Sequence, residues 1–108
     1  MPRSAIHPGI HLAEELKAIG LSASAFSKLI DVPTNRVTAI IKGQRGISAD
    51  TALRLAHWFG TTPEFWLNLQ NIYELRLASA DTGESIAKLP KLERHDPLGD
   101  TERSLPRP

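Results

Sequence analysis

Residues that stop and start helices recur at short intervals along this chain, and they limit its fold more than any other feature. Glycine ends a helix-like pattern at Gly20, Gly43 and Gly60, and serines that favour helix N-caps follow at Ser22 and Ser48. Between these signals apolar residues recur at the spacing of an α-helix, without the alternation of a β-strand. The sequence therefore predicts an all-α domain of short helices joined by tight turns.

Five helices fit the pattern, and together they predict an orthogonal bundle. Their expected bounds are about 8–19, 23–30, 33–42, 49–59 and 63–80. Each of the first four is expected to bury one apolar face against the others. These faces comprise Leu12, Leu16, Ile19, Phe26, Leu29, Ile30, Val37, Ile40, Ile41, Ala52, Leu53, Ala56 and Phe59.

The C-terminal part of the chain differs in composition from the rest. Residues 81–108 hold four of the eight prolines, eleven charged residues and no aromatic. So little apolar area does not offset the entropy that ordering would cost. We expect a folded domain over residues 6–80 and a flexible, mostly disordered tail over 81–108. Within this tail, residues 86–92 could form a short helix or dock as an extended strand.

Composition excludes several classes of protein. The 108 residues include no cysteine, which excludes a disulfide scaffold, a thiolate zinc site and a cysteine nucleophile. No apolar run approaches the roughly 18 residues of a membrane span, and the N-terminus does not resemble a signal peptide. We therefore expect a cytoplasmic protein without membrane contact. The net charge of +1 does not by itself indicate a nucleic-acid partner.

Patterns of catalytic and metal-binding residues were sought as well. The sequence has no triad-like spacing of Ser, His and Asp, no glycine-rich phosphate loop and no prominent carboxylate pair. His7 and His11 have an i,i+4 spacing that can hold a metal on a helix, but Pro8 and Gly9 intervene and no third ligand is near. We expect no enzyme activity, no cofactor and no metal.

The segment 22–43 predicts two helices joined by a three-residue break, which is a helix-turn-helix pattern. On the second helix, Ile40 and Ile41 lie within about 60° of Val37, and the three residues define a core face. The outer face, at about 100–200° from Val37, carries short side chains and one cation. These residues are Asn35, Thr38, Ala39 and Lys42. Such a face lets a helix approach base edges in a DNA major groove.

This surface predicts contacts with double-stranded DNA. The expected base-reading residues are Thr34, Asn35, Arg36, Thr38 and Ala39. The expected phosphate contacts flank the two helices and are Ser22, Ser24, Lys42, Gln44 and Arg45. Residues 22–46 also carry four basic residues against one aspartate, a local charge of +3. The alternative is a solvated face of a helical bundle that does not bind DNA.

The last helix is apolar over an arc of about 200°, whereas a helix lying on a core needs little more than about 100°. A second copy of the chain would cover the surplus and would set two recognition helices ~34 Å apart. The expected dimer contacts are Trp66, Leu69, Tyr73 and Leu77. The alternatives are a central place in the bundle or a cover formed by residues 86–92. The cluster of Trp58, Phe59, Phe65 and Trp66 favours core packing over a ligand pocket.

Four blocks of sequence occur together: HPG and LAEEL within 7–16, GLS at 20–22, DTALRLA at 50–56 and TPEFWLNLQ at 62–70. Their combination resembles the HigA family of antitoxins, which belongs to the Xre/Cro-type, lambda-repressor-like helix-turn-helix group. The resemblance covers about residues 6–80. The joint presence of the first and last blocks makes it specific.

The resemblance implies a five-helix, usually dimeric domain that binds operator DNA and represses its own operon. It also implies that the protein neutralises a HigB-like toxin, which cleaves mRNA on the ribosome. At one position the sequence departs from the family: the glycine usual in the turn is Asp31, which tolerates that backbone conformation better than most residues. Two alternatives stay open, namely a stand-alone Xre-type regulator and a toxin-binding module without DNA binding.

Overall fold

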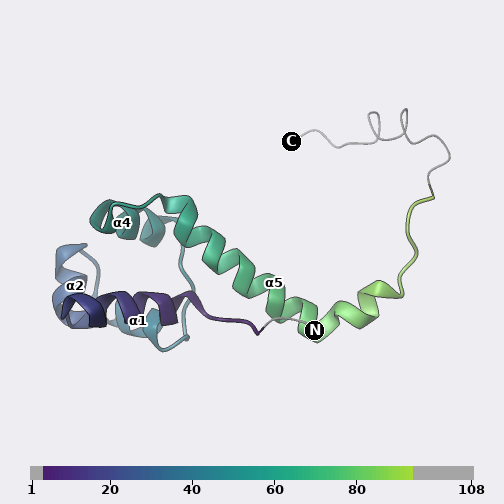
Figure 1. Cartoon of the computed structure of the whole chain (residues 1–108), viewed down its shortest axis with the longest axis horizontal. Helices are drawn as coiled ribbons and strands as arrows, with labels where there is room; N and C mark the ends of the chain where they lie inside the picture. Colours follow the sequence, from purple (N-terminus) through teal and green to yellow (C-terminus); the bar gives the residue numbers. More distant parts are fainter. Residues whose placement is uncertain (1–3, 94–108) are drawn as a thin grey trace.

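The computed structural model describes residues 4–93, which form five α-helices and no strand. The helices are α1 (Pro8–Ile19), α2 (Ala23–Leu29), α3 (Thr34–Ile41), α4 (Ala49–Phe59) and α5 (Pro63–Ala87). In Figure 1 the first four helices form a body at one end, and α5 begins in that body and extends away from it. The predicted all-α, five-helix architecture is confirmed.

The first four helices begin and end close to the expected signals, and α5 begins at its expected signal. Ser22 Oγ accepts a hydrogen bond from the Ala25 N–H at 3.0 Å, and Thr62 Oγ1 accepts one from the Phe65 N–H at 3.1 Å. Gly20 and Gly60 end α1 and α4 in the left-handed conformation, with φ of 73° and 77°. Short polar N-caps and glycine C-caps therefore set the lengths of these helices.

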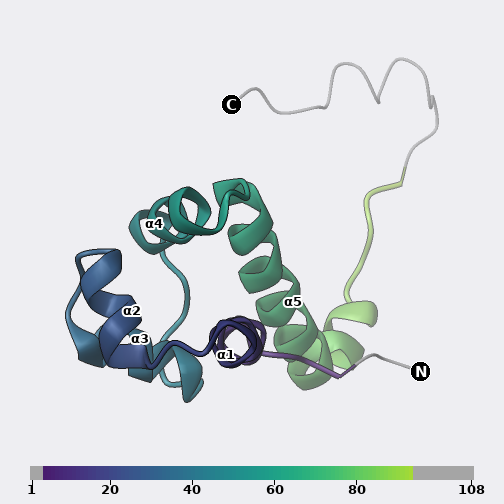
Figure 2. The same cartoon turned by 60° about the vertical axis from the view of Figure 1, so that its left-hand side comes forward.

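The core lies where α1 packs on α3 and α5, α2 packs on α3, and α4 packs on α5. Figure 2 shows α1 nearly end-on beside α3 and α5. The buried apolar residues come from all five helices, from the α2–α3 turn and from the α3–α4 loop: Leu12, Leu16, Phe26, Ile30, Val37, Ile40, Ile47, Ala52, Leu55, Ala56 and Trp66. The aromatic cluster is packing, since Phe59 contacts both Phe26 and Trp66 with ring centroids 5.6 and 5.5 Å apart.

The start of α1 explains the HPG block. His7 is the N-cap, and its Nδ1 accepts a hydrogen bond from the Gly9 N–H at 2.8 Å. Pro8 occupies the first helical position, where no backbone N–H is needed. A Cβ at Gly9 would collide with the backbone carbonyl of Ile40. The block therefore lets α1 approach the C-terminal end of α3 directly.

The start of α5 explains the TPEFWLNLQ block. The Trp66 indole N–H donates to Thr61 Oγ1 at 2.9 Å, and the ring fills the core. Gln70 Oε1 accepts from the Ile47 N–H at 2.8 Å, while its amide nitrogen donates to Glu74 at 2.8 Å. Gln70 therefore ties the α3–α4 loop to α5.

Three of the predicted core positions are wrong. Leu53 is 59% exposed, and Leu55 is buried in its place. The buried face of α4 follows Ala52, Leu55 and Ala56, and Leu53 lies about 100° from Ala52 around the helix axis. Leu29 and Ile19 are exposed as well. Leu29 loses its place because the buried face of α2 turns toward Phe26 and Ser27, and Ile19 lies in the last turn of α1.

The end of α5 also differs from the prediction, because the helix passes Ala80 and continues to Ala87. The expected disorder from residue 81 is therefore wrong for residues 81–87. The prolines that made residues 81–108 look unfavourable for a helix begin only at Pro90. No proline therefore interrupts the helix before that residue. Thr82 Oγ1 also donates to the Ala78 carbonyl at 2.9 Å, within the helix. Residues 94–108, over which the tail was also predicted, lie outside the described residues.

The predicted dimer contacts on α5 need one correction. Trp66 is 1% exposed in a single chain, so its place as a dimer contact is wrong: its own core covers it. Leu69 and Tyr73 are half-buried, and the Tyr73 ring packs edge-on against His7 with centroids 4.8 Å apart. Leu77 is exposed. Over residues 4–93, no helix is long and apolar enough to cross a membrane.

Candidate nucleic-acid interface

Helices α2 and α3 are joined by a tight turn in which Asp31 has a φ of 60°. This is the left-handed conformation that glycine adopts most easily and that aspartate tolerates. The Val32 N–H donates to the Ser27 carbonyl at 3.0 Å and closes the turn. The expectation that the turn survives without glycine is confirmed.

A buried hydroxyl couples the two helices of the motif. Ser27 is fully buried, and its Oγ donates to the Ser24 carbonyl at 2.7 Å. The same oxygen lies 3.1 Å from Thr34 Oγ1, at the first residue of α3. Thr34, predicted to read bases, therefore also holds the start of α3 against α2.

One side of α3 carries most of the predicted base-reading set. Asn35 and Lys42 are exposed, and Thr38 and Ala39 are half-buried. Thr38 Oγ1 lies 3.3 Å from the carbonyl oxygens of both Thr34 and Asn35 and can donate to either. The hydroxyl oxygen and methyl group of Thr38 remain able to meet a base edge. Val37 and Ile40 face the core, as predicted.

The predicted phosphate contacts lie at the two ends of this surface. Ser22 and Ser24 are exposed at the start of α2, and the Ser22 hydroxyl caps that helix. Gln44 and Arg45 are exposed in the α3–α4 loop, which Gln70 holds in place from α5. Ser22 and Ser24 thus lie at the start of the motif, and Gln44 and Arg45 follow it in a loop that a Gln70 hydrogen bond ties to α5.

Arg36 does not lie with the other predicted base-reading residues. Its guanidinium pairs with Asp50 on α4, with Nη1 3.0 Å from Oδ2. Arg54 binds the same carboxylate oxygen through Nε at 2.9 Å. The hydrogen bond from Arg54 is the largest of the effects that hold the pKa of Asp50 below its ordinary value.

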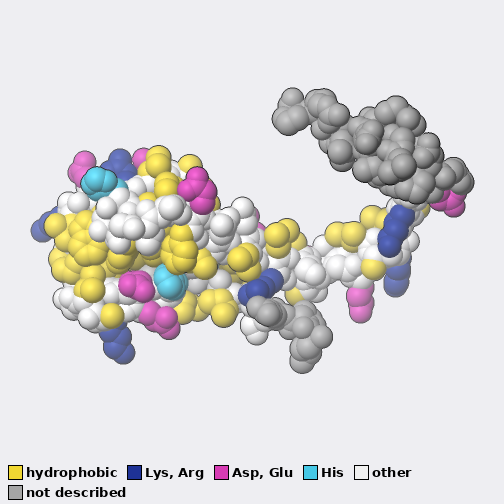
Figure 3. All heavy atoms as spheres, turned by 45° about the horizontal axis from the view of Figure 1, so that its top comes forward, with side chains coloured by type: hydrophobic (Ala, Val, Ile, Leu, Met, Phe, Trp, Pro, Cys, Tyr) yellow, Lys and Arg dark blue, Asp and Glu magenta, His cyan; other side chains and the backbone are white. Residues whose placement is uncertain are grey.

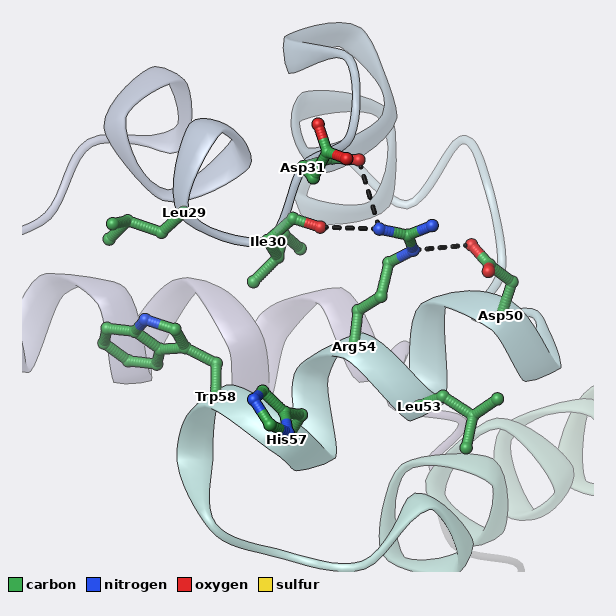
Figure 4. A pocket seen from close by; sticks show the side chains of 8 residues that line it. All are labelled: Leu29, Ile30, Asp31, Asp50, Leu53, Arg54, His57 and Trp58. Carbon is green, nitrogen blue, oxygen red and sulfur yellow. Dashed lines mark hydrogen bonds and ion pairs between the residues drawn. The ribbon is translucent and has the colours of Figure 1, made fainter.

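Figure 4 shows how Arg54 reaches from Asp50 to the turn of the motif. Its Nη1 donates to the carbonyl oxygens of Ile30 at 2.8 Å and Asp31 at 3.2 Å. These residues line an open groove of about 330 Å³, together with Leu53 and Trp58. Our reading of the sequence missed Asp50 and Arg54 as site residues. Their i,i+4 spacing could have signalled the helical ion pair, but not its link to Arg36.

The two histidines that have a metal-like spacing have other contacts. His7 caps α1, and burial lowers its pKa below the ordinary value of 6.5. A hydrogen bond with the backbone of Arg45 acts in the other direction and raises the pKa by a smaller amount. His11 packs edge-on against Phe65 and Trp66, both with centroids 5.5 Å apart. Across the described part of the chain, no three His, Asp or Glu side chains gather as a metal site would require.

This arrangement defines a helix-turn-helix domain: two helices, a tight turn between them, and a polar outer side on the second helix. The helix-turn-helix family model matches residues 12–66. Virulence-associated protein I of Dichelobacter nodosus is 51% identical over 78 residues, which are 71% of this chain and 72% of the relative.

Two solved structures extend the comparison to α5. A HigA-family addiction module antidote protein from Coxiella burnetii has 52% sequence identity and a TM-score of 0.82, covering 84% of this chain and 100% of that chain. The antitoxin HigA of Pseudomonas aeruginosa, solved with the higBA promoter, has 40% identity and a TM-score of 0.78, covering 82% of this chain and 99% of that chain. The chain belongs to the HigA family of Xre-type helix-turn-helix antitoxins.

Proposed function

We propose that this protein is the antitoxin of a HigBA-type module. In this role a homodimer binds operator DNA and represses its own operon, and the same protein binds and neutralises a ribosome-dependent mRNA-cleaving toxin. One observation carries the proposal: one side of α3 and its C-cap presents Asn35, the half-buried Thr38 and Lys42, in a chain similar to an antitoxin solved with its promoter.

The outer side of α3 and the residues after it offer two kinds of DNA contact, one to base edges and one to phosphates. Asn35 offers an amide that can pair with adenine, and Thr38 offers a hydroxyl and a methyl group. Ala39 keeps the closest approach of α3 to the bases short. The cations Lys42 and Arg45 are exposed at the far end of α3, where they can approach the phosphate backbone. Asn35 and Thr38 would then set the sequence preference, and the two cations would set the affinity.

Operator binding is tested by fluorescence anisotropy with the DNA immediately upstream of the protein's own coding sequence. The control is a shuffled duplex of equal length. We expect the upstream DNA to bind more tightly, with an affinity that falls steeply as salt rises. Asn35→Ala should relax the base preference by about 1–3 kcal/mol, whereas Lys42→Ala should weaken binding to both duplexes alike. Equal binding of the two duplexes by the unaltered protein would contradict the proposal.

The case for a homodimer rests on the part of α5 that leaves the body. Ile72, Leu75 and Leu77 are all exposed there, and Figure 3 shows hydrophobic side chains continuing along this helix. A two-fold dimer would cover the same patch on both copies. Sedimentation equilibrium should give a dimer, and Leu75→Lys should shift it toward monomer. A profile of monomer alone for the unaltered protein at micromolar concentration would refute this part.

Neutralisation is tested with the product of the adjacent reading frame. We expect that product to arrest growth when expressed alone and to co-purify with this protein when both are expressed. Co-purification should be measured with the full chain and with a chain ending at residue 93, the last residue described. A neighbour that neither arrests growth nor binds would favour the stand-alone regulator, with operator binding unaffected.

A further inference from the structure

The side chain of Arg36 leaves α3 about 160° from Thr38 and about 100° from Asn35 around the helix axis. It lies about 100° from Val37 in the opposite sense to Thr38, and this turns it toward α4. The contact with Asp50 spans the two helices at 3.0 Å. The Arg36 side chain is 24% exposed, and its Nε is buried without a hydrogen-bond partner among the described residues. Arg36 is thus packed into the domain rather than extended over the outer face of α3.

Asp50 is the centre of a set of hydrogen bonds that connects α3, α4 and the turn between α2 and α3. One of its carboxylate oxygens accepts from Arg36 on α3 and from Arg54 on α4. Arg54 continues the chain to the carbonyls of Ile30 and Asp31. The turn before the recognition helix, the helix itself and the start of α4 are therefore joined through one carboxylate, in addition to the apolar core below α3.

We propose that Asp50 is a positioning residue for operator reading, and that Arg36 acts by holding α3 in place rather than by reading a base. This inference rests on the proposed function, since it concerns how the same surface recognises DNA. In the sequence, Arg36 is a conspicuous candidate for reading guanine. In the structure, its guanidinium binds the Asp50 carboxylate of the same chain instead. The base-reading side of α3 then consists of Asn35, Thr38 and Ala39.

The two kinds of DNA contact respond differently to a small displacement of α3. A base hydrogen bond needs donor and acceptor within about 2.7–3.2 Å and weakens steeply when they move apart. The attraction of a cation to phosphate decays over about 10 Å at 0.1 M salt. Loss of the Asp50 link should therefore reduce discrimination between sequences much more than it reduces binding to any one duplex. Removal of a negative charge would also reduce repulsion from phosphate and strengthen binding to unrelated DNA.

The experiment compares Asp50→Asn, which removes the charge and keeps the shape, with Asp50→Glu, which keeps the carboxylate. Glu14→Gln is the matched control, because Glu14 is exposed on α1 and its substitution makes the same change in net charge. Each variant is titrated with a duplex selected by the unaltered protein from a random library, and with its shuffled counterpart. Circular dichroism melts check that each variant is folded at the assay temperature.

We expect Asp50→Asn to lower the ratio of specific to non-specific affinity about tenfold or more, the size of one lost base contact. Asp50→Glu should restore the ratio to within about threefold, and Glu14→Gln should leave it within about twofold of the unaltered protein. If Asp50 merely kept Arg36 away from a guanine, Asp50→Asn would raise specific affinity, and that result would overturn the inference. So would a ratio for Asp50→Asn equal to that of Glu14→Gln.

A second variant separates holding from reading without touching Asp50. Repeating the library selection with Arg36→Ala should blur base preferences at several positions of the site, because the whole helix is less constrained. Loss of preference at one guanine alone, with all other positions unchanged, would identify Arg36 as a base reader and refute the inference. If the unaltered protein selects no sequence at all, the proposed function itself fails and this inference fails with it.

Discussion

Gln70 offers the sharpest test of how the fold supports the DNA-facing surface. Its Oε1 accepts a hydrogen bond from the Ile47 N–H at 2.8 Å, and within the described residues no other side chain accepts from that N–H. Ile47 is buried at the end of the α3–α4 loop, so water does not readily replace that bond. A Cβ at Gly46 would lie 2.7 Å from the Gln70 amide nitrogen, which shows how closely the loop packs against this side chain. Gln70→Ala should therefore loosen the loop that carries Gln44 and Arg45.

The size of the effect follows from the group that is left behind. A buried backbone N–H without a partner costs about 1–3 kcal/mol. At about 2 kcal/mol, the melting temperature of a domain this small should fall by roughly 8–16 °C. Glu74→Gln is the control, because its carbonyl oxygen can still accept from the Gln70 amide; as a surface change it should stay within about 0.5 kcal/mol.

Stability is measured by urea unfolding at one fixed protein concentration, with tryptophan fluorescence as the signal. Amide hydrogen exchange at Ile47 is measured separately on the folded protein. The exchange rate at Ile47 should rise in Gln70→Ala and stay unchanged in Glu74→Gln. DNA affinity should fall to a similar degree for specific and shuffled duplexes, because the loop carries predicted phosphate contacts. Loss of under about 0.5 kcal/mol with unchanged exchange at Ile47 would refute the reasoning.

Two further predictions concern the first helix and the turn. The pKa of His7 lies below its ordinary value of 6.5 because the ring is buried, so the neutral form is favoured in the folded state. This contribution to stability is complete above pH 6.5 and is lost as pH falls through the folded-state pKa. The difference in unfolding free energy between the unaltered protein and His7→Asn should therefore shrink on acidification, and a pH-independent difference would count against it. The second prediction concerns Asp31, whose φ is 60°. In thermal melts Asp31→Gly should be more stable than Asp31→Ala by about 1 kcal/mol, because alanine is strained at this φ and glycine is not. Equal stability of the two variants would contradict this reasoning, since it would show that the turn readjusts.

Helix boundaries and most of the core could be predicted from the sequence because they depend on local signals. The caps at Ser22, Ser48 and Thr62 each act on the backbone N–H three residues further along the chain. Leu53 was assigned to the core incorrectly because Leu53 and Leu55 lie about 200° apart around α4, and the packing of α4 on α5 decides which of the two is buried. The length of α5 was underestimated because composition was averaged over residues 81–108, whose first proline, Pro90, comes after the helix has ended.

The candidate site was predictable only where it depends on the face of a single helix. Asn35, Thr38 and Lys42 share one side of α3 by helical geometry, so their grouping follows from spacing. The partner of Arg36 does not, because Asp50 lies fourteen residues away on another helix. Side-chain chemistry alone made Arg36 a base reader, and only the tertiary structure, which places Asp50 of α4 3.0 Å from its guanidinium, reveals the carboxylate that holds it.

The sequence blocks that carry the family resemblance have mainly structural tasks in this molecule. His7 and Gly9 bring α1 against α3, while Trp66 and Gln70 fix α5 to the core and to the α3–α4 loop. None of these four residues lies on the outer side of α3. The resemblance therefore identifies the scaffold far better than it identifies the operator. Operator preference should follow Asn35, Thr38 and Ala39, so exchanging these three residues between members of the family should transfer base preference while leaving the scaffold intact.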